Sequence, residues 1–68
     1  MTYNEIVPYG LYYITLDVIF REEIERKKIK FMIRVSAKSK FSEVIEFTFL
    51  NDNSIIYYAY PYQLSKIE

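Results

Sequence analysis

The sequence contains no cysteine and no histidine, and these two absences remove most of the chemistry that small proteins use. Without cysteine there is neither a disulfide nor a thiolate nucleophile, and without histidine the commonest general base and metal ligand is missing. Because Gly10 is the only glycine, a glycine-rich phosphate loop is excluded as well. We therefore expect no catalytic residue, no metal site and no cofactor, and a protein that is not an enzyme.

Three polar clusters resemble functional motifs, and surface turns explain each of them better. Residues 38–40 read Lys-Ser-Lys but lie in a polar connection without an oxyanion loop. Glu22, Glu23 and Glu25 stand beside basic residues that neutralise them. Residues 51–53 read Asn-Asp-Asn but lack the glycine and terminal glutamate of a calcium loop.

The chain also lacks targeting and membrane signals. Its first residues carry no basic stretch followed by an apolar core, so they do not predict a signal peptide. The longest uncharged aromatic run, residues 55–62, is too short to span a bilayer. We therefore expect a cytoplasmic protein with no membrane partner and no small-molecule substrate. At 68 residues the chain has room for one domain, residues 1–68, of marginal stability.

The composition favours β-strands, because ten isoleucines, eight tyrosines and five phenylalanines accompany one glycine and two prolines. Apolar and polar residues alternate over residues 11–20, 28–36 and 43–50, which predicts three strands with one buried face. The residues predicted to face the core are Tyr12, Ile14, Leu16, Val18, Phe20, Ile29, Phe31, Ile33, Val35, Ile45, Phe47 and Phe49.

A tight turn at residues 51–53 predicts a final hairpin, since Asn and Asp tolerate positive φ. Pairing Leu50 with Ser54 would place Phe49 opposite Ile55 and Phe47 opposite Tyr57. We expect this fourth strand to run to Tyr60, because Pro61 cannot donate to a ladder.

The predicted fold is all-β: a single small domain with a four-stranded, or five-stranded, antiparallel meander. The fifth strand would lie before Leu11, with residues 8–10 as a bend. Glutamate and basic residues four positions apart allow at most a short helical turn near residues 21–27. The apolar face needs a cover. It could curl into a small barrel, pack as a dimer with a second copy, or be covered by the two termini.

Charge is distributed unevenly in a chain whose net charge is zero. Residues 26–40 carry a net charge of +7, whereas residues 1–25 carry −4 and residues 41–68 carry −3. Proteins bind nucleic acids through rows of outward cations, which contact the phosphates, and through aromatic rings, on which the bases stack. The candidates are Lys28, Lys30, Arg34, Lys38, Lys40 and Tyr13. A solvated strand face is the alternative explanation.

The outer side of the last hairpin is a second candidate surface, because it gathers apolar and aromatic side chains. Its residues are Val44, Thr48, Ile56, Tyr58 and Tyr60. The leading hypothesis is a small interaction protein that binds a protein partner, or itself as a homodimer, through this face or its edge. Chains of this kind occur among phage and mobile-element accessory proteins that inhibit or modulate host factors. The alternatives are a nucleic-acid-binding β module and a structural subunit of a larger assembly.

Overall fold

The computed structural model describes residues 1–20 and 25–67. It is all-β and forms one small domain, with a five-stranded antiparallel sheet and two short 3-10 turns in the described part. In chain order the elements are η1 (Tyr3–Glu5), β1 (Leu11–Phe20), β2 (Glu25–Lys38), β3 (Ile45–Phe49), β4 (Asp52–Ala59), η2 (Pro61–Gln63) and β5 (Leu64–Ser65). No helix in the described ranges has the length and apolar character needed to cross a membrane.

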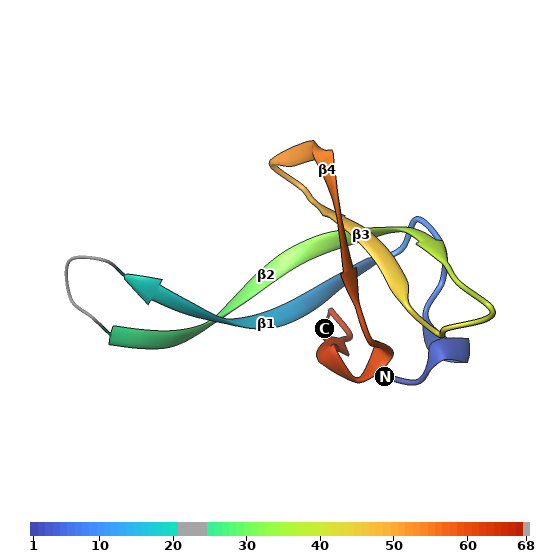
Figure 1. Ribbon diagram of the computed structural model, residues 1–68, viewed down its shortest axis with the longest axis horizontal. Helices are drawn as coiled ribbons and strands as arrows, with labels where there is room; N and C mark the ends of the chain where they lie inside the picture. The colour runs from blue at the N-terminus through green and yellow to red at the C-terminus, as the bar shows by residue number, and fades with distance from the viewer. Residues whose placement is uncertain (21–24, 68) are drawn as a thin grey trace.

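The strands lie in the order β4-β3-β2-β1-β5, so the chain passes from one edge of the sheet to the other between β4 and β5 (Figure 1). In a flat sheet these two edges would be about 19 Å apart, at about 4.8 Å per strand. Only five residue steps join Ala59 to Leu64, which reach about 18 Å fully extended and less through η2. The sheet must therefore curl.

Two details of the predicted fold are wrong. The sheet curls without closing into a barrel. Its fifth strand, β5, comes from the C-terminal segment and pairs with Tyr13 and Ile14 of β1, whereas the segment before Leu11 forms η1 and a turn. The sequence allows at most a short helical turn near residues 21–27, and of these residues 25–27 belong to β2, while residues 21–24 lie outside the described ranges. Helical i,i+4 pairs contribute only about 0.2–0.5 kcal/mol each, too little to compete with a continuous ladder.

The bend at residues 8–10 is confirmed. The Gly10 N–H donates to the Val7 carbonyl at 3.0 Å, which closes a turn with Pro8 at its second position. Tyr9 takes the third position with φ of 67°, a left-handed conformation that costs a non-glycine residue energy. Hydrogen bonds hold it there, because its N–H donates to the Val35 carbonyl at 2.7 Å and its carbonyl accepts from Arg34 Nη1 at 2.9 Å.

The core confirms the alternation in the centre of the sheet. Six of the residues predicted to face inward are buried: Tyr12, Ile14, Ile33, Val35, Ile45 and Phe47. The cover comes from the two terminal segments, because Ile6 and Leu64 are only 1% and 2% exposed within the same cluster. The Met1 amino group also donates to the Leu64 carbonyl at 3.3 Å, so the two segments meet. Of the three covers considered, the termini are the one that the structure shows.

The last hairpin is confirmed in part. Phe47 lies opposite Tyr57 as predicted, but Phe49 lies opposite Asp52 rather than Ile55, so the turn consists of Leu50 and Asn51. The register shifts because Asp52 Oδ1 accepts hydrogen bonds from the Ser54 N–H at 3.0 Å and the Ser54 hydroxyl at 2.6 Å. This local turn takes up residues that a regular ladder would have paired. β4 ends at Ala59, and Pro61 begins η2.

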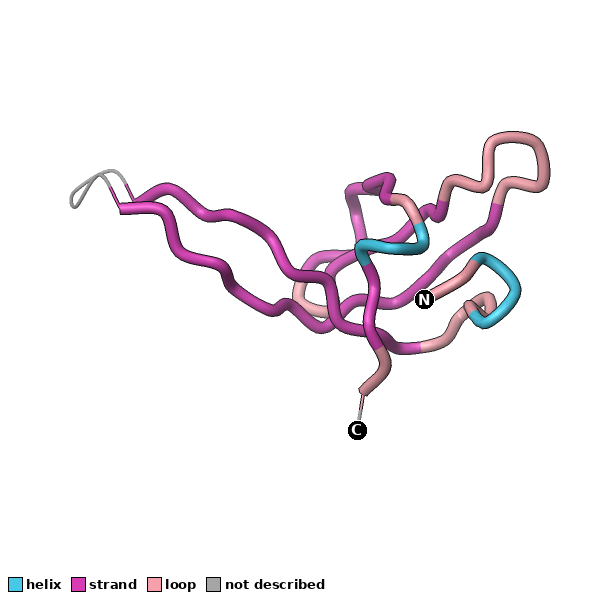
Figure 2. Tube along the Cα trace, turned by 90° about the horizontal axis from the view of Figure 1, so that it is seen from below, coloured by secondary structure: helices cyan, strands magenta, loops and turns pink. Residues whose placement is uncertain are grey.

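The β1–β2 hairpin extends beyond the rest of the molecule as an arm (Figures 1 and 2). β3 pairs with β2 only between Ile33 and Lys38, and β5 pairs with β1 only at Tyr13 and Ile14. The two strands continue to the Phe20–Glu25 pair without a third strand. The molecule therefore measures 40 Å along this direction, against 26 and 24 Å across it.

Candidate functional site

The predicted interface on the last hairpin is partly assembled by the structure. Val44, Tyr58 and Tyr60 line one small cavity of about 150 Å³. Thr48 lies elsewhere on the outer face, opposite Arg34 of β2, because the register shift removes its expected partner on β4. Ile56 lies within the shifted segment and is 52% exposed. The structure thus brings three of the five residues together and leaves the other two apart from them.

The edge of β4 is the most exposed apolar segment of the described chain. Every residue from Asp52 to Tyr58 is exposed, including Ile55, Ile56 and Tyr57. Since β4 is the last strand of the sheet, one side of its backbone faces outward with unpaired N–H and C=O groups. Lysine, proline or a covering loop usually protects such an edge, but residues 53–60 contain no charge and no proline.

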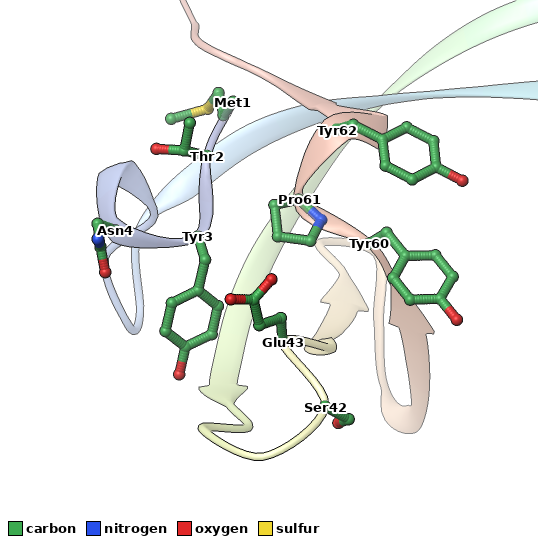
Figure 3. A pocket seen from close by; sticks show the side chains of 9 residues that line it. All are labelled: Met1, Thr2, Tyr3, Asn4, Ser42, Glu43, Tyr60, Pro61 and Tyr62. Carbon is green, nitrogen blue, oxygen red and sulfur yellow. The ribbon is translucent and has the colours of Figure 1, made fainter.

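A groove of about 470 Å³ lies beside the end of β4, between η1, the loop of residues 39–44 and η2 (Figure 3). The rings of Tyr60 and Tyr62 stack along one side of it, with centroids 5.8 Å apart and planes 7° from parallel. The Glu43 side chain points between Tyr3 and Pro61 (Figure 3). Glu43 has φ of 55°, and its N–H donates to the Ser39 carbonyl at 3.1 Å. The groove therefore extends the aromatic surface of β4 past the end of the strand.

The basic residues predicted as nucleic-acid candidates separate into two groups. Lys28, Lys30 and Arg34 lie on the outer face of β2, opposite Asp17, Thr15 and Leu11 of β1. Tyr13 shares that face, and Lys30 Nζ lies 5.8 Å from the centroid of its ring. Arg26, which the candidate set omits, lies on the same face opposite Ile19. Lys40 lies in the loop after β2 and is exposed.

Lys38 is placed differently from its expected position. It is the last residue of β2 rather than part of a loop, and its Nζ donates to the Tyr3 and Ile6 carbonyls, both at 2.8 Å. The same ammonium lies 4.2 Å from the centroid of the Tyr3 ring. Its donors therefore hold the N-terminal segment against the sheet.

A β-bulge explains why Lys38 lies on the inner face. Val35 is opposite Phe47 and Ala37 is opposite Glu46, so Ser36 has no residue facing it. The extra residue reverses the alternation, and Lys38 comes to lie opposite the buried Ile45. The Ser36 hydroxyl donates to the Glu46 carbonyl at 3.2 Å, which fixes the bulge.

Two of the three polar clusters set aside at the outset lie at or beside turns, whereas Glu22 and Glu23 of the third lie outside the described ranges and Glu25 begins β2. Lys38 is turned away to the N-terminal carbonyls, and the Ser39 hydroxyl oxygen accepts from the Ser42 hydroxyl at 3.0 Å. The hydrogen bonds from Ser54 lower the pKa of the exposed Asp52 carboxyl. Within the described ranges, no three acidic residues are grouped as a metal site would require.

Glu5 gives the N-terminal segment a pH dependence. Its carboxylate accepts hydrogen bonds from the Thr2 N–H at 2.8 Å and the Thr2 hydroxyl at 2.9 Å, and the first of these is the main reason its pKa is lowered from 4.5. The ionised form is therefore the one that the fold stabilises. Its contribution is present above the ordinary pKa and is lost as the pH falls through the lowered value.

We expect the wild type to melt at a higher temperature than Glu5→Gln at neutral pH. This difference should shrink as the pH falls from the ordinary carboxyl pKa of 4.5 through the lowered pKa of Glu5, because the wild-type side chain then becomes neutral too. Thermal unfolding followed by circular dichroism at a series of pH values measures it. A difference that is the same at every pH would show that the charge of Glu5 has no role.

The predictions from strand periodicity did not include several exposed apolar residues. Phe41 is fully exposed in the loop of residues 39–44, and Tyr62 is exposed in η2. Alternation gives no signal in loops and 3-10 turns, so only the three-dimensional arrangement shows that Tyr62 lines the groove beside β4.

Comparisons with protein-family models, with curated proteins and with solved structures gave no match to this chain.

Proposed function

We propose that the protein is a non-enzymatic interaction module whose β4 edge pairs with an extended strand of another protein. The carrying observation is the exposed, uncharged edge from Asn53 to Tyr58 at one end of the sheet. Addition of a strand would satisfy the outward N–H and C=O groups, and alternate side chains of β4 would select the partner. The cavity under Tyr58 and the adjoining tyrosine groove support this proposal, because aromatic side chains contribute strongly at protein interfaces.

The chemistry of the edge indicates what kind of strand it accepts. Residues 53–60 hold isoleucine, tyrosine and small polar residues without a charge, so a charged partner strand would lose hydration without gaining an ion pair. The partner strand should therefore be uncharged and rich in β-branched or aromatic residues. β4 itself meets this description, and antiparallel pairing of two copies would bring no like charges together over these residues.

In purified protein we expect a reversible dimer formed through β4, and Ile56→Lys should convert it to a monomer. A lysine on an edge strand disfavours edge-to-edge pairing, because two copies would bring like charges together. Sedimentation equilibrium over a series of protein concentrations gives the mass. Ile19→Lys is the matched control, because Ile19 is also an exposed isoleucine, at 62%, but lies on the arm. That control should remain dimeric.

Two results would contradict the proposal. One is a dimer that survives Ile56→Lys and Tyr58→Lys equally, which would place the contact elsewhere. The other is a wild type that stays monomeric while an added peptide copy of residues 52–60 fails to bind. If the wild type is monomeric but binds that peptide, the edge accepts a strand and the natural partner is a different protein.

A further inference from the structure

The outer face of the arm gathers positive charge in a chain that is neutral overall. Lys28 and Lys30 project from this face of β2 together with Arg26 and Arg34, and all four are exposed. Side chains two residues apart on one strand are separated by about 6.8 Å, so Arg26, Lys28 and Lys30 form an even row about 14 Å long. Asp17, opposite Lys28, is the one acidic residue that the register of β1 and β2 places on this face, and Glu46 lies on the same face of the sheet in β3.

The two faces of the arm differ in character, because the outer face carries most of the cations and the opposite face is mainly apolar. The opposite face of the arm carries Leu16, Val18, Ile29 and Phe31, which are half-buried, together with Lys27. On the outer face, Arg34 gives one N–H to the Tyr9 carbonyl, and Lys30 lies over the Tyr13 ring. Both interactions hold a side chain in place on the exposed face, where its charge stays accessible to a polyanion.

The shape of the arm limits which polyanion fits. Beyond Ile33 and Ile14 it consists of two strands only, since β3 and β5 do not reach further along it (Figure 2). A two-stranded β-ribbon fits the major groove of B-form DNA, which is about 12 Å wide. The major groove of double-stranded RNA is too narrow and deep for side chains to read. Single strands are bound mainly by rows of stacking rings, and Tyr13 is the one ring that β1 and β2 place on this face.

We propose that the outer face of the β1–β2 arm binds double-stranded DNA, with the ribbon in the major groove and Arg26, Lys28 and Lys30 against the phosphates. Arg34 adds a fourth phosphate contact from the base of the arm, where β3 pairs with β2. This activity goes beyond the β4 interaction and uses a different part of the molecule. Residues 21–24 carry a net charge of −1 in the sequence, so they add nothing to the positive charge of this face.

The proposal is tested by fluorescence anisotropy with a mixed-sequence DNA duplex, the matching RNA duplex and one DNA strand. Four phosphate contacts predict a log–log salt slope of about −3.6, so affinity for duplex DNA should fall roughly a hundredfold between about 50 and about 200 mM salt. Lys28→Glu combined with Lys30→Glu should lower affinity at about 50 mM salt by at least about a hundredfold. Lys40→Glu combined with Lys66→Glu makes the same change in net charge away from the arm, and should alter it by less than about threefold.

Asp17→Asn provides a gain-of-binding test, which a misfolded variant would not produce. It removes the acid from the face and should tighten binding to duplex DNA roughly five- to tenfold at about 50 mM salt. The proposal is overturned if no salt-sensitive binding occurs at low salt, if both double variants lose affinity equally, or if Asp17→Asn has no effect. RNA duplex or single-stranded DNA bound as tightly as duplex DNA would overturn the assignment to the major groove.

Discussion

Replacing Ile33 by alanine is expected to lower the free energy of unfolding by about 2–5 kcal/mol, the usual cost of removing a large buried aliphatic side chain. Ile33 is 0% exposed and lies between Tyr12 of β1 and Phe49 of β3 on the inner face. At about 0.05–0.15 kcal/mol per residue, a chain of this length has only about 3–10 kcal/mol in total. The variant should therefore unfold at much lower denaturant concentration or be unfolded in buffer, as followed by circular dichroism.

Ile19→Ala is the matched control for this experiment. It makes the same chemical change on the same hairpin, but Ile19 lies on the exposed face of the arm. Its free energy of unfolding should change by no more than about 0.5 kcal/mol. Equal losses in the two variants would mean that the inner face of β1 and β2 is not the core of the domain.

Lys38→Met should lower the free energy of unfolding by about 2–3 kcal/mol and release the N-terminal segment from the sheet. Methionine keeps an unbranched chain but cannot donate, so the Tyr3 and Ile6 carbonyls would lose a charged donor worth about 1.5–3 kcal/mol in such bonds. The contact between the ammonium and the Tyr3 ring would also be lost. Chemical denaturation measures the stability, and amide exchange at Glu5 and Ile6 reports on the segment.

The control for Lys38 is Lys40→Met, because Lys40 is exposed in the following loop. That variant should leave stability and exchange at Glu5 and Ile6 close to the wild type. If both variants behave alike, Lys38 does not anchor the segment. The inward direction assigned to its side chain by the bulge at Ser36 would then be wrong.

The buried centre of the sheet is predictable from the sequence, because alternation is strongest where one face is fully covered. Ile14, Ile33, Val35, Ile45 and Phe47 follow it without exception and are all buried. Leu16 and Phe31 fit the same pattern but are only half-buried, because the arm carries them away from the other strands. Periodicity assigns a face to each side chain, but it does not say whether anything packs against that face.

The features that sequence reasoning missed depend on single hydrogen bonds or on distant contacts. The Ser36 bulge reverses the direction of Lys38, and the turn at Asp52 shifts Ile55 and Ile56 out of register. The hydrophobic periodicity of the sequence reveals neither feature. One unrecognised inserted residue then reverses the predicted face of every residue after it. β5 has only two residues, and its place beside β1 depends on the curl of the whole sheet.

The outward direction of the cations of β2 is predictable from alternation, and the structure places these side chains outward. The side chains of β4 carry no such signal, because this strand is apolar on both sides, and all of its residues from Asp52 to Tyr58 are exposed. The exposed edge of β4 becomes apparent only once the strand order is known. Strand order depends on which segments meet in space, and a single sequence reports this poorly.

Amide hydrogen exchange along residues 53–58 tests the proposed role of the β4 edge most directly, because it observes the backbone groups that would pair. In dilute protein the outward N–H groups of β4 should exchange rapidly, since the edge has no partner strand. We expect these amides to become protected as the protein concentration rises, or when the peptide copy of residues 52–60 is added. Rapid exchange of these amides under both conditions would contradict it.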